Sequence, residues 1–208
     1  MNEKPILFCG EMVRAILTGR KSQTRRIVKF PEWFHDEYSR YDSREIYSEL
    51  SCPHGYPGDL LWVRETFWLQ KNGNQSYAIT DQHPFEVKYS NGQHGGFEHL
   101  DWFKKDKGYK KKPSIFMPRW ASRINLVVTD VRVERVQNLS EKDARLEGCK
   151  SADSLTGREC LDPDMGSYRL HYRWLWDSIN GKRPGCCWSD NPFVWVIEFQ
   201  RVVLCYPR

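Results

Sequence analysis

Residues that could do chemistry crowd into one short segment near the N-terminus, Gly19–Arg26, which holds four Arg or Lys side chains and one threonine. Guanidinium and ammonium groups bind anions, and main-chain N–H groups in a tight connection can help to hold the same anion. Lys21 and Thr24 lie within this segment. The sequence alone leaves two interpretations open: a site for a phosphate or a polar small molecule, and a solvated basic loop.

The elements on either side of this segment fix its place in the chain. Residues 11–17 put their apolar side chains on one helical face, which predicts a short amphipathic helix. Gly19 suits the position after the helix end, because glycine adopts the left-handed conformation without a Cβ penalty. The β-branched pair Ile27-Val28 then favours a strand. We therefore expect a tight helix-to-strand connection.

A carboxylate in an unfavourable local position is the second feature of interest. Ser140 and Asp143 form a capping-box pattern that predicts a helix start, and Gly148 predicts its end. Glu147 then stands in the last helical turn, where the helix dipole disfavours a negative charge. A residue that is poorly suited to its local structure indicates a use elsewhere in the fold.

Composition favours a folded protein with a substantial core. The chain has 208 residues, 39% hydrophobic and 14% aromatic, and a net charge of +5 that permits an anionic partner without requiring one. Its seven cysteines follow a first segment with no long apolar stretch, and no run of about 18 apolar residues exists. We expect a cytoplasmic protein with reduced thiols, no membrane contact, no cofactor and no metal.

Strand signals outnumber helix signals. Long strands are predicted over 60–68, 124–136 and 193–203, with a shorter one over 4–8 and a helix over 168–179. Residues 77–80 and 85–89 are predicted to pair as a hairpin. The pattern lacks a repeated β–α–β rhythm and predicts an α+β fold, a partly closed, mostly antiparallel β-barrel with accessory helices.

One inserted region carries a cluster of lysines interleaved with Trp102, Phe103 and Tyr109. Cations that track phosphates and rings that stack bases are typical of a nucleic-acid surface, and a solvated loop is the alternative. Four other tryptophans, in contrast, are predicted to be core residues: Trp62, Trp68, Trp174 and Trp195. The lysines of this predicted nucleic-acid surface are Lys104, Lys105, Lys107, Lys110, Lys111 and Lys112.

The order of these motifs resembles the ASCH domain family, and most of all its phage and prophage members. The resemblance covers residues 4–28, 56–68, 122–148 and 192–202, from Gly19-Arg20-Lys21-x-x-Thr24 through the Leu139-Ser140-Glu141-Lys142 helix start to the last strand. It implies a PUA-like β-barrel. The whole chain, 1–208, would then be one such domain with long insertions at about 30–55, 69–118 and 149–191.

Some ASCH proteins remove the acetyl group from N4-acetylcytidine, and the resemblance implies the corresponding roles here. Lys21 would accept a proton, Thr24 would act as nucleophile and Glu147 would donate a proton. These roles are chemically consistent, since a lysine with a depressed pKa can activate a hydroxyl and a neutral carboxylic acid can protonate a leaving amine. Arg20, Arg25 and Arg26 would bind substrate or depress the pKa of the lysine.

Three functions therefore stay open. The first is an amidohydrolase acting on a linear amide of a modified nucleoside. The second is a noncatalytic module that binds single-stranded RNA or a nucleotide. The third is a ribonuclease, which would need metal-free chemistry because the sequence shows no evident metal cluster.

Overall fold

The computed structural model describes residues 1–31, 42–72, 75–80, 85–89, 94–97, 109–150 and 167–202, with only the backbone described at 71–72, 75–79, 85–89 and 94–97. Within these ranges no helix is both long and apolar enough to cross a membrane. The lysines at 104, 105 and 107 and residues 151–166 of the insertion predicted over 149–191 fall outside the described residues.

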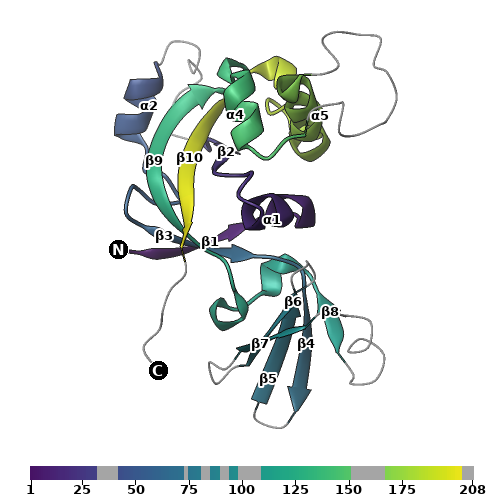
Figure 1. The fold of residues 1–208 in the computed structure, drawn as a ribbon. Helices are drawn as coiled ribbons and strands as arrows, with labels where there is room; N and C mark the ends of the chain where they lie inside the picture. The colour runs from purple at the N-terminus through teal and green to yellow at the C-terminus, as the bar shows by residue number, and fades with distance from the viewer. Residues whose placement is uncertain are drawn as a thin grey trace, which may run out of the picture. The chain divides into compact units, whose positions relative to one another are not determined.

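Two sheets account for the described strands (Figure 1). The larger one has the strand order β1-β3-β9-β10-β2, with β1 parallel to β3 and the pairs β3–β9 and β10–β2 antiparallel. The smaller one has the order β7-β6-β5-β4-β8, and its neighbours are antiparallel. The predicted α+β class with mostly antiparallel strands is confirmed.

Most element bounds follow the sequence signals, but the strand predicted at Ile27-Val28 begins earlier, at Gln23. Thr24 therefore lies in a strand and not on the predicted helix-to-strand connection, because residues 23–27 pair with β10. The larger sheet consists of β1 (Glu3–Leu7), β2 (Gln23–Ile27), β3 (Leu60–Arg64), β9 (Asn125–Arg135) and β10 (Phe193–Val202). The smaller sheet consists of β4 (Phe67–Asn72), β5 (Gln75–Thr80), β6 (Phe85–Tyr89), β7 (His94–Phe97) and β8 (Lys110–Lys112). The α-helices are α1 (Gly10–Leu17), α2 (Ser43–Glu49), α4 (Glu141–Leu146) and α5 (Tyr168–Asn180), and the short 3₁₀ turns are η1 (Ser114–Phe116), η2 (Arg119–Ala121), η3 (Val136–Asn138) and η6 (Trp188–Asp190).

The chain divides into two compact units. Unit 1 contains Met1–Thr18, Gly58–Val127 and the residues from Gln200, and unit 2 contains Gly19–Pro57 and Val128–Phe199. Unit 1 therefore carries the smaller sheet, whose core holds Phe67, Met117 and Ala121. The segments that carry Lys21 and Glu147 both belong to unit 2.

The β10 strand organises unit 2 because both of its faces are buried. Val194 and Val196 pack into an apolar cluster with residues of α4, α5 and η6. Trp195 lies between these two valines in the strand, so its side chain points to the other face of β10. There it makes an edge-to-face contact with Tyr47 of α2, with 6.0 Å between the ring centroids. One face of β10 and its neighbour β2 is thus covered by α4 and α5.

The strand predicted over 60–68 is two strands, β3 and β4, which belong to different sheets. The break falls at Glu65, whose carboxylate forms a buried bidentate pair with Arg123 at 2.8 and 3.0 Å. The backbone N–H of Glu65 donates to Met117 Sδ instead of to a neighbouring strand. A charged side chain with its own buried partner therefore ends the ladder where the alternating pattern predicted continuation.

The prediction that Trp174 is a core residue is wrong. Helix α5 buries Tyr172 and Trp176, which are one turn apart. Trp174 lies on a different face of the helix, and 59% of its surface is exposed. Trp62 and Trp195 are buried as predicted, and Trp68 is half-buried.

Candidate functional site

The two candidate residues furthest apart in sequence are backbone neighbours in unit 2. Lys21 and Glu147 form an isolated antiparallel bridge, and the backbone N–H of Ser22 donates to the carbonyl of Leu146 at 3.0 Å. The connection that precedes β2 therefore lies directly against the end of α4. This pairing places one candidate side chain opposite the other.

The Lys21 ammonium has three hydrogen-bond partners, which matches its three protons. Its Nζ donates to the carbonyl oxygen of Gln23 at 2.7 Å, to the carbonyl oxygen of Glu147 at 2.8 Å and to Glu147 Oε2 at 2.7 Å. The side chains of Lys21 and Glu147 are only 2% and 4% exposed. Lys21 is therefore neither a solvated cation nor part of a mobile basic loop.

Burial lowers the pKa of Lys21 below its usual range, because desolvation disfavours the ammonium. The Glu147 carboxylate opposes this effect through its charge and its hydrogen bond, and Arg26 adds to the lowering through charge repulsion. The combined effect of these groups is to lower the pKa of Lys21. The sequence-based expectation that arginines would depress this pKa is met by Arg26, but burial is the larger cause.

Glu147 takes a second cation on its other oxygen. Arg25 Nη1 lies 3.2 Å from Glu147 Oε1, and the Arg25 side chain is fully buried. The carboxylate thus bridges a lysine and an arginine. An arginine stays protonated at every accessible pH, whereas a lysine with a lowered pKa can lose its proton.

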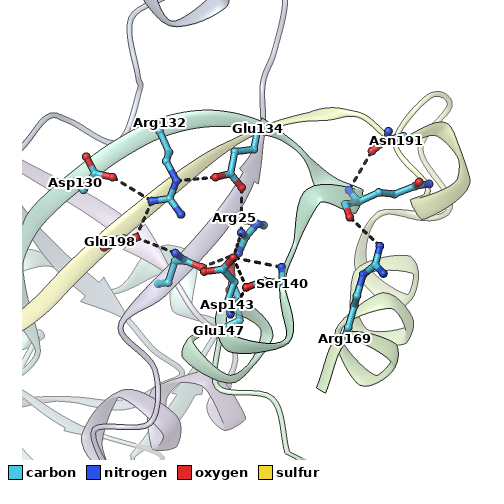
Figure 2. Close-up of polar contacts among 12 residues, drawn as sticks. Arg25, Asp130, Arg132, Glu134, Ser140, Asp143, Glu147, Arg169, Asn191 and Glu198 are labelled. Carbon is cyan, nitrogen blue, oxygen red and sulfur yellow. Dashed lines mark hydrogen bonds and ion pairs between the residues drawn. The ribbon is translucent and has the colours of Figure 1, made fainter. Parts of the chain in front are cut away.

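A closed ring of hydrogen bonds joins Arg25 of β2 to side chains of β9 and β10, and it reaches from buried to partly exposed residues. Figure 2 shows the ion pairs of this ring. Its links are Arg25 Nη2 to Glu134 Oε2 (3.3 Å), Arg132 Nε to Glu134 Oε1 (2.7 Å), Arg132 Nη1 to Glu198 Oε1 (2.6 Å), Gln23 Nε2 to the same Glu198 oxygen (3.1 Å) and Arg25 Nη1 to Gln23 Oε1 (2.7 Å). We call these five residues the interstrand network. Gln23 and Arg25 are buried, while Arg132, Glu134 and Glu198 are partly exposed.

Helix α4 holds Glu147 in place through its own caps. The predicted capping box is present: Ser140 Oγ accepts from the N–H of Asp143, whose carboxylate accepts from the N–H of Ser140. Glu147 is the C-cap residue, and Gly148 follows with φ +88°, the left-handed conformation that the sequence predicted for a helix end. Asp143 also approaches Arg25 at 3.5 Å, which ties the start of α4 to β2.

Thr24 belongs to β2, is buried and pairs with Ile197 of β10. Gln23 and Arg25 contact each other, and the alternation of a regular strand predicts that the side chain between them points to the opposite face. The structure brings Lys21, Arg25 and Glu147 together, and the role of Thr24 stays a prediction.

The other predicted binding residues are spread over different surroundings. Arg20 is exposed and donates to the carbonyl of Gly148 at 3.3 Å, and Arg26 is half-buried in β2. Of the lysine cluster, Lys110–Lys112 form β8 in unit 1, and Lys111 Nζ lies 5.7 Å from the centre of the Trp68 ring. Lys104, Lys105 and Lys107 fall outside the described residues.

Sequence reasoning missed Gln23, Arg132, Glu134 and Glu198. The available signal was alternation in one case: Arg132 and Glu134 are two residues apart in a predicted strand. Gln23 has the same spacing from Arg25, but the sequence placed both residues in the connection before a strand. In the described parts of the chain, no three His, Cys, Asp or Glu side chains are grouped so that they could hold a metal ion.

Comparison with known proteins gives a structural likeness alone. No family model and no curated protein sequence matches the chain. Its structure is similar to that of an ASCH domain from Lactobacillus crispatus JV V101, at 13% identity and TM-score 0.42, covering 98% of this chain and 81% of that one. It is also similar to a DUF984 protein from Enterococcus faecalis V583, at 9% identity and TM-score 0.42, covering 100% and 86%.

Proposed function

We propose that this protein is a hydrolase that removes an acyl group from the amide nitrogen of a modified nucleoside such as N4-acetylcytidine, with Lys21 and Glu147 as its acid–base pair. The observation that supports the proposal is the 2.7 Å contact between two buried ionisable groups, Lys21 Nζ and Glu147 Oε2. The pKa of Lys21 is lowered, as a general base requires.

A single proton transfer would prepare both partners for amide hydrolysis. Moving one proton from Lys21 Nζ to Glu147 Oε2 converts an ion pair into a neutral amine and a carboxylic acid. Burial favours the neutral arrangement because both charges are desolvated, while the Arg25 guanidinium at 3.2 Å favours the carboxylate. The balance between these effects sets how readily the pair becomes a base beside an acid.

The reaction then runs as two proton movements around one bond exchange. The Lys21 amine takes a proton from the nucleophile, whose oxygen bonds to the acyl carbon. Glu147 gives its proton to the amide nitrogen, the carbon–nitrogen bond breaks, and the nucleoside leaves as an amine. If the nucleophile is a hydroxyl group of the protein, a water molecule then releases acetate from the ester, and the proton on Lys21 returns to Glu147.

The proposal leaves two candidates for the nucleophile, the Thr24 hydroxyl and a water molecule, and a substitution of Thr24 distinguishes them. Thr24 is the proposed nucleophile from the sequence, yet strand alternation predicts that its side chain points to the face of β2 opposite to Gln23 and Arg25. A water molecule activated by Lys21 would serve the same step. Replacement T24A abolishes turnover if the threonine attacks, and leaves most of it if water attacks.

The remaining arginines divide between two roles. Arg25 is buried and engaged with Glu147, so it acts on the acid–base pair. Arg20 is exposed beside Gly148, and Arg26 is half-buried near Lys21, so these two are the proposed contacts for the nucleoside.

The decisive experiment measures acetate release from N4-acetylcytidine by the wild type and by K21M and E147Q. Each variant should lose about 10²–10⁴-fold in kcat, the usual contribution of a general acid or base. The matched control is E134Q, which also removes a carboxylate from Arg25 but does not touch Lys21. Folding is verified by circular dichroism. Full activity in folded K21M would reject the proposal.

Binding of single-stranded nucleic acid is the second candidate, favoured by the surface around β8 in unit 1. Lys110 and Lys111 are exposed on this strand, and η1, which follows it, exposes 68% of Phe116. Cations and an exposed aromatic ring are the groups that hold a nucleic-acid strand. The double variant K110A/K111A should weaken binding of a single-stranded RNA and flatten its salt dependence, while the exposed Lys182→Ala control should not.

A further inference from the structure

Gln23 is the one residue of the interstrand network that also contacts Lys21. Its backbone carbonyl accepts from Lys21 Nζ at 2.7 Å, and its side-chain oxygen accepts from Arg25 Nη1 at 2.7 Å. Its side-chain nitrogen donates to Glu198 Oε1 at 3.1 Å. The side chain is fully buried, so these contacts are made without competition from solvent.

We propose that Gln23 is a positioning residue of the Lys21–Glu147 pair, one that holds the ammonium with its backbone and controls with its side chain how much of Arg25 reaches Glu147. The geometry points to this role because Arg25 Nη1 is shared between two acceptors. It lies 2.7 Å from Gln23 Oε1 and 3.2 Å from Glu147 Oε1.

The sharing matters because Arg25 and Lys21 compete for the same carboxylate. Any strengthening of the Arg25–Glu147 contact neutralises more of the carboxylate, so the carboxylate then stabilises the Lys21 ammonium less. The Gln23 amide draws the guanidinium toward itself and thereby limits this neutralisation. Its own orientation is fixed, since only the oxygen can accept from Arg25 and only the nitrogen can donate to Glu198.

The charged and titratable groups that act on Lys21 come from every neighbouring element. Glu147 and Cys149 approach from the end of α4, and Arg26 from β2. From α5, Tyr172 interacts with the Glu147 carboxylate. The Gln23 side chain carries no charge, so in the wild type that side chain acts on Lys21 through the geometry of Arg25 and Glu147.

Two substitutions of similar size should therefore move the proton affinity of Lys21 in opposite directions. In Q23M the amide oxygen is lost, Arg25 Nη1 turns to Glu147 alone, and the pKa of Lys21 falls further. In Q23E a carboxylate holds Arg25 more firmly and adds a negative charge beside Lys21, so the pKa of Lys21 rises. The control is a second glutamine, the partly buried Gln137, whose amide donates to the Trp188 carbonyl at 2.8 Å.

The experiment follows the Lys21 side chain by NMR as pH is varied, in the wild type and in Q23M, Q23E, Q137M and Q137E. Opposite shifts in the two Gln23 variants, with an unchanged titration in both Gln137 variants, support the positioning role. Lys21 pKa shifts in the same direction in Q23M and Q23E would overturn the proposal. An unchanged Lys21 titration with a lowered melting temperature would also overturn it, because it would show that Gln23 has a structural role alone.

A milder variant keeps the test decisive if the Gln23 variants do not fold. Glu198 is 38% exposed, and E198Q removes the charge that anchors the Gln23 amide without replacing a buried side chain. This variant should lower the pKa of Lys21 by less than half as much as Q23M would. A titration identical to that of the wild type would overturn the proposal.

The catalytic consequence rests on the proposed hydrolase function, and the two can fail separately. If the function holds, the pH dependence of kcat/KM follows the shifts seen by NMR, while KM changes little. If the NMR shifts occur in a protein that hydrolyses no acylated nucleoside, the proposed function fails and the role of Gln23 stands.

Discussion

Each unit of this protein contains a buried pair of opposite charges, and the two pairs are built differently. In unit 1, Arg123 and Glu65 are each 1% exposed and meet through two parallel hydrogen bonds, at 2.8 and 3.0 Å. In unit 2, Lys21 meets Glu147 through one nitrogen–oxygen contact, and the carboxylate shares its other oxygen with Arg25. The first pair lies at a strand break, and the second combines one carboxylate with two different cations.

The difference lies in the cation. A guanidinium stays charged and its fork matches a carboxylate, so the Arg123–Glu65 pair holds one arrangement at any pH at which the fold survives. The pKa of a lysine falls when it is buried, and this fall is the direction at Lys21. Burial alone therefore does not indicate a functional pair; the identity of the cation and a third charge beside it do.

The largest effect on stability is expected from breaking the pair in unit 1. R123M leaves Glu65 buried without its guanidinium partner, and removal of one member of a buried pair costs about 3–5 kcal/mol. Urea denaturation should show this loss in the free energy of unfolding. A loss below about 1 kcal/mol would mean that Glu65 finds another partner or becomes protonated at little cost.

Breaking the pair in unit 2 is expected to cost less stability. In K21M the Glu147 carboxylate keeps Arg25 at 3.2 Å, so about 1–3 kcal/mol should be lost. The same denaturation measurement compares the two variants directly. If K21M loses as much free energy of unfolding as R123M, or more, the proposed difference between the Arg123–Glu65 pair and the Lys21–Glu147 pair is contradicted.

The pH dependence of stability should also separate the pairs. Because the pKa of Lys21 is lower in the folded state than in the unfolded chain, the unfolded state binds more protons between these two values. The wild type should therefore gain stability relative to K21M as pH rises through that window, up to about 10.4, the ordinary lysine value. The difference between R123M and the wild type should stay flat over the same window.

A smaller effect of opposite sign is expected from Cys149. Burial raises the pKa of this thiol to about 12 from a usual value of 9.0, so the unfolded chain loses the proton first. The thiol thus contributes stability below about pH 9 that declines as pH rises toward 12. C149A should remove this alkaline decline in denaturation experiments, and an unchanged decline would assign it to other groups, such as Tyr172, whose pKa is raised as well.

Local sequence patterns predicted more of the fold than of the candidate site. The caps at Ser140 and Gly148, the strand patterns of β9 and β10 and the hairpin of β5 with β6 were all readable because each depends on neighbouring residues. The break at Glu65 was hidden, because it depends on Arg123, 58 residues later in the chain. Alternation predicted continuation there, and a long-range ion pair prevented it.

The site shows the same limit. Glu147 was noticed because a carboxylate suits a helix end poorly, and Lys21 because of its basic neighbours, but their mutual contact spans 126 residues and no local pattern encodes it. The expectation that Thr24 would join them came from the family resemblance, and it stays a prediction. Strand alternation in β2 predicts that its side chain points away from the face that Gln23 and Arg25 share.

The most direct test of the central claim joins the titration of Lys21 to catalysis. The pKa of the Lys21 amine is measured by NMR, and the pH dependence of kcat/KM is measured with N4-acetylcytidine on the same protein. We predict that the rate falls on the alkaline side of the profile with the pKa of Lys21, because loss of the one proton that the pair shares leaves Glu147 without a proton to donate, and that this value lies below that of an ordinary lysine. Full hydrolytic activity at pH values where Lys21 is completely deprotonated would contradict the account.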